Sequence, residues 1–443
     1  MMRCLYRSYQ WTPRLTRWVA RRLTPAGRLV VAVLVLATFL GTDLDRAAGP
    51  RTLLLGLILL VLAAGFSPFF RGRFRVERRL PRVASVGERL RYPVRIENCT
   101  ERRLAGLEVL EELADEPLEY AAFIARLRPT SRGQSGRFTS VLRRGRVEPV
   151  ALPPLNPGEV LTTHLEWVPR RRGLLHFAAV GIARTDPLGL FRSPVRVPAP
   201  QTLVVLPRRY PVPELHLSGT PKYQPGGVAL ASRVGESEEF LALREYRPGD
   251  PLRRIHWRSW ARAGTPVTKE YQDEFFSRHA LVLDTFTGPD NEEVFEEAVS
   301  VAASFAAQTR SADVLLDLLF TGDRAYRVTA GRGLAPVSQL LEVLAAVPRA
   351  TALKFETLHH RVLEHAHEVT GAVCVLIGWD EERRELVEQL IARGVQLHVL
   401  VIVPRSQRRP PEPGPRIASA GFHVLTAGRI REDLARITSH SRA

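Results

Sequence analysis

The sequence predicts a membrane-anchored, multi-domain chain: a hairpin of two transmembrane helices, then an all-β domain, then a doubly wound α/β domain. Three observations support this prediction. Two uncharged apolar runs lie near the N-terminus, short alternating runs follow them, and beyond residue 279 apolar runs of strand length alternate with segments of helical period. With 443 residues, of which 45% are hydrophobic and 25% charged, the chain is long enough for several folded domains.

The two apolar runs predict the helical hairpin. Leu29–Thr42 and Thr52–Phe70 are separated by a short polar turn. Because a span needs about 20 residues, the second run is long enough, and the first requires residues 25–28 to extend it. Arginine-rich flanks on both sides are expected to stay in the cytoplasm. These features predict a multi-pass cell-membrane protein whose N-terminus and C-terminal domains are cytoplasmic.

The net charge of +17 is unevenly distributed along the chain. Residues 1–28 contain seven arginines and no acidic residue, whereas residues 213–443 carry a net charge of −2. A basic chain first suggests nucleic acid or anionic lipid as its partner. Since the C-terminal half is not basic, we expect membrane lipid and no nucleic acid.

Other patterns argue against several further classes. A secretory signal in residues 1–48 is a competing interpretation of the basic start, but no A-x-A cleavage site follows the first run. Cys4, Cys99 and Cys374 lie far apart, which argues against a disulfide framework and a cysteine-rich zinc module. No lysine follows a glycine, so the phosphate-binding GK[ST] loop is missing from the sequence.

Residues 71–210 are predicted to form a β-sandwich-like domain. Leu90, Tyr92 and Val94 are interleaved with arginines, the period-two pattern of half-buried antiparallel strands. Proline and glycine clusters, such as the one at residues 186–189, supply the turns. The surplus arginines of this domain either contact anionic lipid or form a solvated face, and the sequence leaves both interpretations open.

Residues 235–276, called here the signature segment, are predicted to contain a turn and a short helix. Asp250 is expected to cap this helix and Gly264 to end it. The helix would carry a stripe of arginines at every fourth position: Arg254, Arg258 and Arg262. Acidic and basic residues are nearly balanced in the segment, which favours an ion-pair lattice or a protein-docking face over a phosphate site.

The C-terminal region is predicted to form the doubly wound sheet. In such sheets, ligands bind beyond the carboxyl ends of the strands, where Asp284 and Asp380 are expected. The predicted strands are His279–Leu283, Val314–Phe320, Gly371–Ile377 and Leu397–Val403, and the predicted helices lie at 291–310, 334–347, 354–368 and 382–393.

Three motifs of the signature segment point to a known family. They are Arg244-Glu245-Tyr246-Arg247-Pro248-Gly249-Asp250, Arg254-Ile255-His256-Trp257 and Lys269-Glu270-Tyr271. With the upstream Arg172-Gly173 and Asp186-Pro187-Leu188-Gly189-Leu190-Phe191, they resemble the domain-of-unknown-function 58 family. The resemblance implies a membrane-anchored bacterial protein with a von Willebrand factor type A-like C-terminal domain and no established catalytic activity. The partners it implies are a MoxR-type AAA+ ATPase and a transglutaminase-like membrane protein.

The prediction for function is therefore a non-enzymatic interaction or scaffold protein that docks partners through the signature segment. The docking residues expected are Arg244, Tyr246, Arg247, Asp250, Arg254, His256, Trp257, Arg258, Lys269 and Glu270. The expected order of parts is 1–28 basic N-terminus, 29–70 transmembrane helices, 71–210 β-domain, 211–278 signature region leading into the sheet, and 279–443 type A-like domain.

The type A resemblance also implies a metal-ion-dependent adhesion site, built from Asp-x-Ser-x-Ser, a distant threonine and a distant aspartate. The first motif here reads Asp284-Thr285-Phe286-Thr287-Gly288, which keeps the aspartate and replaces both serines. Thr351 and Asp380 are the counterparts of the distant residues. Such a degraded site would hold Mg²⁺, and no other cofactor is expected.

Two other interpretations of these carboxylates stay open. Asp380 is well placed to cap the following helix, and Asp284 to form a turn after its strand. The alternative function is a metal-dependent hydrolase that uses Asp284 and Asp380 at the strand ends.

Overall fold

A computed structural model provides the structure of the chain. It describes residues 19, 22–40, 48–66, 70–114, 148–212, 240–248, 250, 252, 255–271, 277–288, 291–308, 314–331, 336–407, 409–414, 417 and 421–440. The chain divides after Leu206 into two units, which are described separately.

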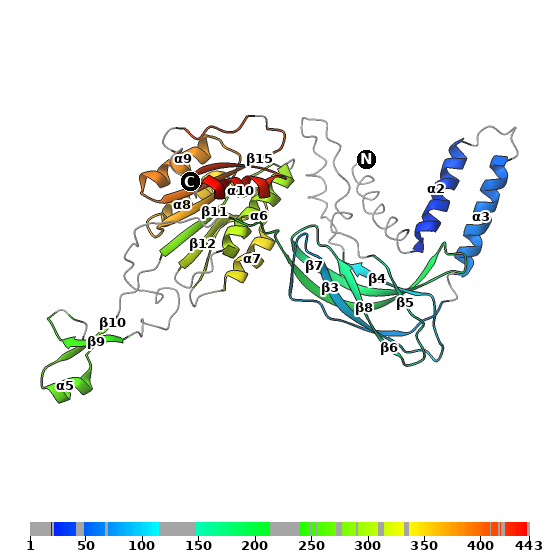
Figure 1. The fold of residues 1–443 in the computed structure, drawn as a ribbon, viewed down its shortest axis with the longest axis horizontal. Helices are drawn as coiled ribbons and strands as arrows, with labels where there is room; N and C mark the ends of the chain where they lie inside the picture. Colours follow the sequence, from blue (N-terminus) through cyan, green and yellow to red (C-terminus); the bar gives the residue numbers. More distant parts are fainter. Residues whose placement is uncertain are drawn as a thin grey trace. The chain divides into compact units, whose positions relative to one another are not determined.

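Two apolar helices precede the β-domain (Figure 1), α2 (Pro25–Leu40) and α3 (Ala48–Phe66). The 16 residues of α2 extend about 24 Å at 1.5 Å per residue. In α3, Arg51 interrupts the apolar sequence, and the uncharged part from Thr52 to the helix end is about 22 Å long. Among the described residues, no helix is both long and apolar enough to cross a membrane. The predicted transmembrane hairpin and the multi-pass membrane localisation are therefore wrong.

The start of α2 is attached to a loop of the β-domain. The Thr24 backbone N–H donates to the Leu190 carbonyl at 3.0 Å, and its hydroxyl donates to the Gly189 carbonyl at 2.5 Å. Asp186 holds this loop, because its carboxylate accepts from the backbone N–H groups of Leu188 and Phe191 at 3.0 and 2.6 Å. The motif from Asp186 to Phe191 thus has a structural role.

The β-domain consists of two sheets that share one apolar core, the arrangement of a β-sandwich. A three-stranded sheet has the order β1-β3-β6, and a five-stranded sheet the order β2-β8-β7-β4-β5. The ring of Phe177 meets those of Tyr92 and Trp167 edge to face in the core. The strands are β1 (Phe74–Arg78), β2 (Val83–Ser85), β3 (Leu90–Asn98), β4 (Leu107–Leu113), β5 (Val150–Leu152), β6 (Val160–Trp167), β7 (Gly173–Thr185) and β8 (Arg192–Leu206).

The predicted alternation is present in β3, where Leu90, Tyr92 and Val94 are buried. A charged pair also lies inside this domain. The guanidinium of Arg78 donates to the Glu111 carboxylate, and neither side chain is exposed. The Tyr92 hydroxyl donates to the second oxygen of that carboxylate at 2.9 Å, so both oxygens have a donor.

The α/β domain contains a six-stranded sheet in the order β13-β12-β11-β14-β15-β16. All neighbouring strands run parallel except β13, an antiparallel edge strand that the sequence did not predict. The strands are β11 (Ser277–Leu283), β12 (Val314–Thr321), β13 (Ala325–Ala330), β14 (Gly371–Ile377), β15 (Gln396–Val403) and β16 (Phe422–Thr426). The helices are α6 (Glu292–Gln308), α7 (Val337–Ala346), α8 (Phe355–His365), α9 (Glu381–Ala392) and α10 (Ile430–His440).

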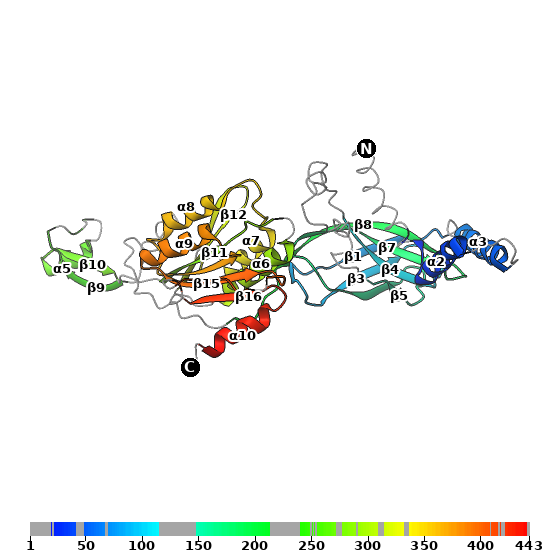
Figure 2. The same cartoon turned by 90° about the horizontal axis from the view of Figure 1, so that it is seen from above.

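Helices cover both faces of this sheet (Figure 2). On one face, Leu358 of α8 and Leu386 of α9 pack with Val282 and Cys374 in a single core cluster. Helices α6 and α7 contact each other, and α6 packs against β11, β14 and β15. Strands β12 and β14 lie on opposite sides of β11. The order in which successive strands are added to the sheet therefore reverses between β11 and β14. Doubly wound sheets bind ligands at this point, beyond the carboxyl ends of the strands.

Candidate functional site

The strand-end site lies at the carboxyl ends of β11 and β14. Asp284 directly follows β11 and is fully buried. Its Oδ1 accepts from the Phe286 N–H at 2.8 Å, and its Oδ2 accepts from the Ile377 N–H at 2.9 Å. The first of these bonds forms the turn after the strand, as one of the two open interpretations predicted. The second ties the ends of β11 and β14 together.

Asp380 caps helix α9. Its Oδ1 accepts from the Arg383 backbone N–H at 3.1 Å, which satisfies a donor that the first helical turn cannot pair internally. The capping interpretation of Asp380 is thus confirmed. Acidic residues Glu381 and Glu382 follow in the first turn, where the helix dipole favours negative charge.

One arginine connects the two aspartates, and sequence reasoning missed it. The Nε of Arg383 donates to Asp284 Oδ2 at 2.7 Å, and its Nη1 donates to Asp380. The spacing of three residues from the helix cap Asp380 to Arg383 in the first turn of α9 was the available signal. The contact with Asp284 was invisible in the sequence, because that residue lies 99 positions away.

Burial and mutual contact shift the pKa values of both partners in the strand-end site. Burial raises the pKa of Asp284, and this effect outweighs the lowering by the Arg383 guanidinium and by the N–H groups of Ile377 and Phe286. Burial lowers the pKa of Arg383, but Asp284 and Asp380 outweigh this effect and raise it overall. The arginine therefore remains positively charged beside the buried carboxylate.

The other residues predicted for a metal site are not gathered around these carboxylates. The Thr285 hydroxyl donates to the Thr321 carbonyl at 2.5 Å. The loop that contains Thr351 comes near, since the Ala350 N–H donates to the Thr285 carbonyl at 3.1 Å, but Thr351 itself is exposed. Within the described part of the chain, no three His, Cys, Asp or Glu side chains are grouped to hold a metal ion.

The signature segment folds into a small unit, called here the signature unit. It comprises β9 (Phe240–Glu245), α5 (Trp257–Ala263), β10 (Val267–Tyr271) and the described residues between them. Strands β9 and β10 pair antiparallel, with Arg244 opposite Thr268. Two of the motifs that carried the family resemblance are thus neighbours in one hairpin.

Asp250 does not cap the helix as predicted. Its two oxygens accept from Nη1 and Nη2 of Arg244 at 2.8 and 2.7 Å, and Oδ2 also accepts from the Arg247 N–H at 2.9 Å. Helix α5 begins seven residues later, after His256, whose Nδ1 lies 2.7 Å from the Ser259 hydroxyl. Gly264 ends it as predicted, with a φ of 73° that favours glycine.

The remaining predicted docking residues that the structure describes are half-buried or exposed. The Tyr246 N–H donates to the Pro266 carbonyl at 2.9 Å, and Lys269 is half-buried. Trp257 and Arg258 lie exposed on α5. Arg254 lies outside the described residues, as does the side chain of Glu270.

Sequence reasoning also missed the half-buried Trp260 and two exposed leucines as members of the surface of this unit. Trp260 stacks on Trp257 with ring centroids 5.3 Å apart and an interplanar angle of 18°. Leu243 and Leu252 are exposed large hydrophobic residues. The spacing of the two tryptophans, three positions apart on a helix, was the signal that could have found the stack.

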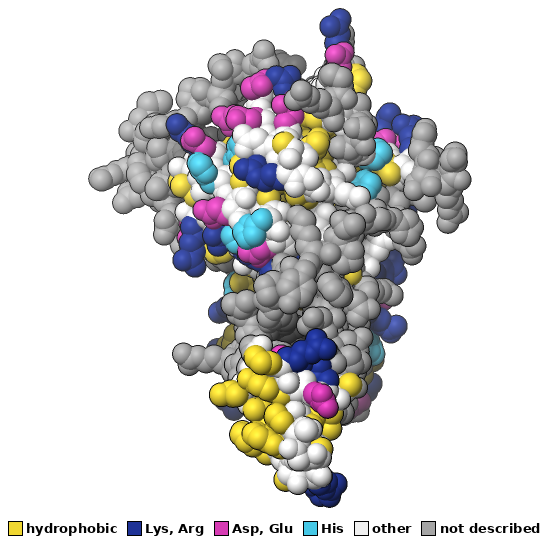
Figure 3. All heavy atoms as spheres, turned by 90° about the vertical axis from the view of Figure 1, so that its left-hand side faces the viewer, with side chains coloured by type: hydrophobic (Ala, Val, Ile, Leu, Met, Phe, Trp, Pro, Cys, Tyr) yellow, Lys and Arg dark blue, Asp and Glu magenta, His cyan; other side chains and the backbone are white. Residues whose placement is uncertain are grey.

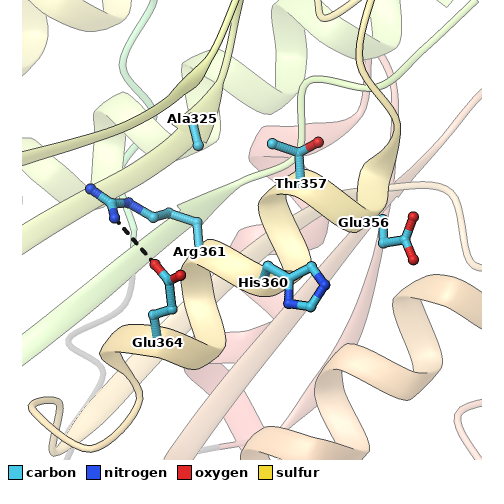
Figure 4. Close-up of a pocket in the computed structure, with 6 residues that line it drawn as sticks. All are labelled: Ala325, Glu356, Thr357, His360, Arg361 and Glu364. Atoms are coloured by element: carbon cyan, nitrogen blue, oxygen red, sulfur yellow. Dashed lines mark hydrogen bonds and ion pairs between the residues drawn. The ribbon is translucent and has the colours of Figure 1, made fainter.

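A separate depression of about 710 Å³ lies along α8 (Figure 4). None of its lining residues belongs to the strand-end site. Arg361 and Glu364 form an ion pair at 3.2 Å within it. The lining residues are Ala325, Glu356, Thr357, His360, Arg361 and Glu364.

The solved structures that match parts of this chain have low sequence identity and low TM-scores. A von Willebrand factor type A protein from Catenulispora acidiphila is 12% identical, with 40% of this chain and 44% of that chain covered and a TM-score of 0.28. The CARDB domain of PF1109 from Pyrococcus furiosus is 14% identical, with 30% and 89% covered and a TM-score of 0.18. The fold therefore rests on the strand order and packing described above.

Comparison of sequences finds similarity in part of the C-terminal half. The "Uncharacterized protein YeaD" of Bacillus subtilis (strain 168) is 32% identical over 139 residues, which cover 30% of this chain and 32% of that protein. The match thus spans about a third of this relative's length. Residues 242–413 match the family "Protein of unknown function DUF58", which confirms the predicted family resemblance over this part of the chain.

Proposed function

We propose that this chain is a non-enzymatic interaction protein that docks a protein partner through the signature unit. The observation that carries the proposal is the exposed apolar surface of this unit. Trp257 is 65% exposed, Leu252 67% and Leu243 41%. In Figure 3, hydrophobic side chains gather on this unit at the bottom of the view. Gathered apolar side chains on a surface are typical of interaction sites.

The residue types of this surface suit binding. Tryptophan and arginine are the residues that most often contribute a large share of the binding energy at protein interfaces. The stack of Trp257 on Trp260 restricts the motion of both rings, so binding would order them at a lower entropic cost. The Arg244–Asp250 pair similarly restrains the neighbouring loop before a partner arrives.

The charge of helix α5 indicates the chemistry of the partner. Arg258 and Arg262 are exposed, and α5 contains no acidic residue. A matching partner face would have an apolar centre and an acidic rim. The partner that the family resemblance implies is a MoxR-type AAA+ ATPase, and we propose that such an ATPase presents this face. A metal-dependent hydrolase is not supported, because Arg383 engages both Asp284 and Asp380.

Co-purification tests this function. A tagged MoxR-type AAA+ ATPase from the same genome should recover the wild-type chain, and Trp257→Ala should reduce recovery at least tenfold. Leu174→Ala is the matched apolar control, because Leu174 is 53% exposed on the β-domain. Equal recovery of wild type and Trp257→Ala would rule out docking through the signature unit.

A second co-purification experiment tests whether the partner has an acidic rim. Arg258→Glu should weaken binding, and the loss should shrink as salt is raised, because salt screens exposed charges. Arg409→Glu provides the charge control on an exposed arginine of the α/β domain, outside the signature unit. If both reversals weaken binding equally, only the net charge matters, and the contact with α5 is not specific.

A further inference from the structure

The side chain of Arg383 lies where the type A resemblance would require a metal ion. We propose that its guanidinium is the built-in cation of the strand-end site, so that this edge of the sheet works without a metal ion. The arginine is 8% exposed and contacts both carboxylates that the resemblance assigns to the metal. The inference concerns this site alone and does not depend on docking through the signature unit.

All three nitrogens of the guanidinium donate a hydrogen bond, and one of its faces packs on an aromatic ring. Nε donates to Asp284 at 2.7 Å, Nη1 donates to Asp380, and Nη2 donates to the Phe286 carbonyl at 3.2 Å. The flat face lies over the Phe355 ring, 4.8 Å from its centroid. Arginine suits this position because its planar group provides five N–H donors and stays charged.

The donor set does not fit Mg²⁺. Both oxygens of Asp284 already accept hydrogen bonds from backbone or arginine N–H groups. Mg²⁺ needs oxygen ligands at about 2.0–2.1 Å in octahedral geometry, and the two serine positions hold Phe286 and Gly288, which have no hydroxyl. A divalent ion bound by Asp284 would also be repelled by the positive charge of the neighbouring guanidinium.

The arginine performs the cross-linking that a metal would otherwise provide. It joins the loop after β11, through Asp284 and Phe286, to the first turn of α9. A metal with an open coordination position can also bind a carboxylate of a partner, whereas each nitrogen of this guanidinium already donates a hydrogen bond within the chain. Any partner bound at this edge is therefore recognised without a shared cation.

Thermal unfolding of the full chain with and without Mn²⁺ tests the proposal, with Mn²⁺ as a probe that electron paramagnetic resonance also detects. Mn²⁺ at millimolar concentration should leave the wild-type Tm unchanged. Arg383→Ala should lower the Tm by about 10 °C, because it leaves a buried carboxylate without its partner. In that variant, Mn²⁺ should raise the Tm, since the carboxylates become available.

Arg384→Ala is the matched control, because Arg384 is the next residue on α9 and pairs with the exposed Glu381. Equal unfolding temperatures for Arg383→Ala and Arg384→Ala would overturn the proposal. So would a stoichiometric Mn²⁺ site in the wild-type chain that Asp380→Asn removes. This second comparison needs no variant of the buried residues, so it decides the question even if Arg383→Ala does not fold.

Discussion

The guanidinium of Arg244 donates to both carboxylate oxygens of Asp250, at 2.8 and 2.7 Å. This bidentate pair joins the end of β9, through Arg244, to the segment between β9 and α5, through Asp250. The hydrogen bonds from Arg244, and then the bond from the Arg247 N–H, lower the pKa of Asp250 below its ordinary value of 3.8. Because the pKa of Asp250 is lowered, the pair stabilises the loop fully at pH values above 3.8. This stabilisation is lost as the pH falls through the lowered pKa of Asp250.

We expect Arg244→Ala to return the pKa of Asp250 towards 3.8. A carbon-13 NMR titration of the selectively labelled aspartates measures it, with Asp250→Asn used to assign the signal. Arg258→Ala is the control, because this arginine is exposed on α5 and no bond to Asp250 is found. A wild-type Asp250 that titrates at 3.8 or higher would contradict the bidentate geometry.

The buried strands of the α/β domain were the most predictable part of the fold. A parallel strand covered by helices on both faces must be apolar throughout, so the sequence marks it directly. The run Gly371–Ile377 was predicted with the bounds that β14 has, and each of its residues is buried. By contrast, β13 was missed because five of its six residues are only half-buried, which leaves no clear apolar pattern.

The errors arose where a side-chain partner outside the predicted helix decides the structure. Asp250 has the position of a helix cap, but its carboxylate instead pairs with Arg244 at the end of β9, and the helix begins only at Trp257. The same limit concealed the contact of Arg383 with Asp284. The length of the apolar run Thr52–Phe70 predicted a spanning helix, but the sequence did not show that α3 ends at Phe66.

The buried pair in the β-domain should contribute far more to stability than an exposed one. Glu111→Gln leaves the fully buried Arg78 without its counter-charge, which is expected to cost about 3–5 kcal/mol. Glu97→Gln is the matched control, because Glu97 pairs with Arg75, whose side chain is 79% exposed, and such pairs contribute about 0–1 kcal/mol. Urea unfolding of the full chain measures both changes. Similar losses for the two variants would show that burial does not set the strength of the Arg78–Glu111 pair.

The two described cysteines should differ sharply in reactivity. Cys99 is exposed, whereas Cys374 is buried in β14, and burial raises the pKa of its thiol to about 12. At pH 8, about one Cys374 thiol in ten thousand would be the reactive thiolate, and the reagent would also need the sheet to open. In a Cys4→Ser background, we expect one fast thiol in a disulfide-exchange assay and a second only after denaturant is added. Cys99→Ser should remove the fast phase, and a fast phase that survives this change would mean that β14 opens in the native state.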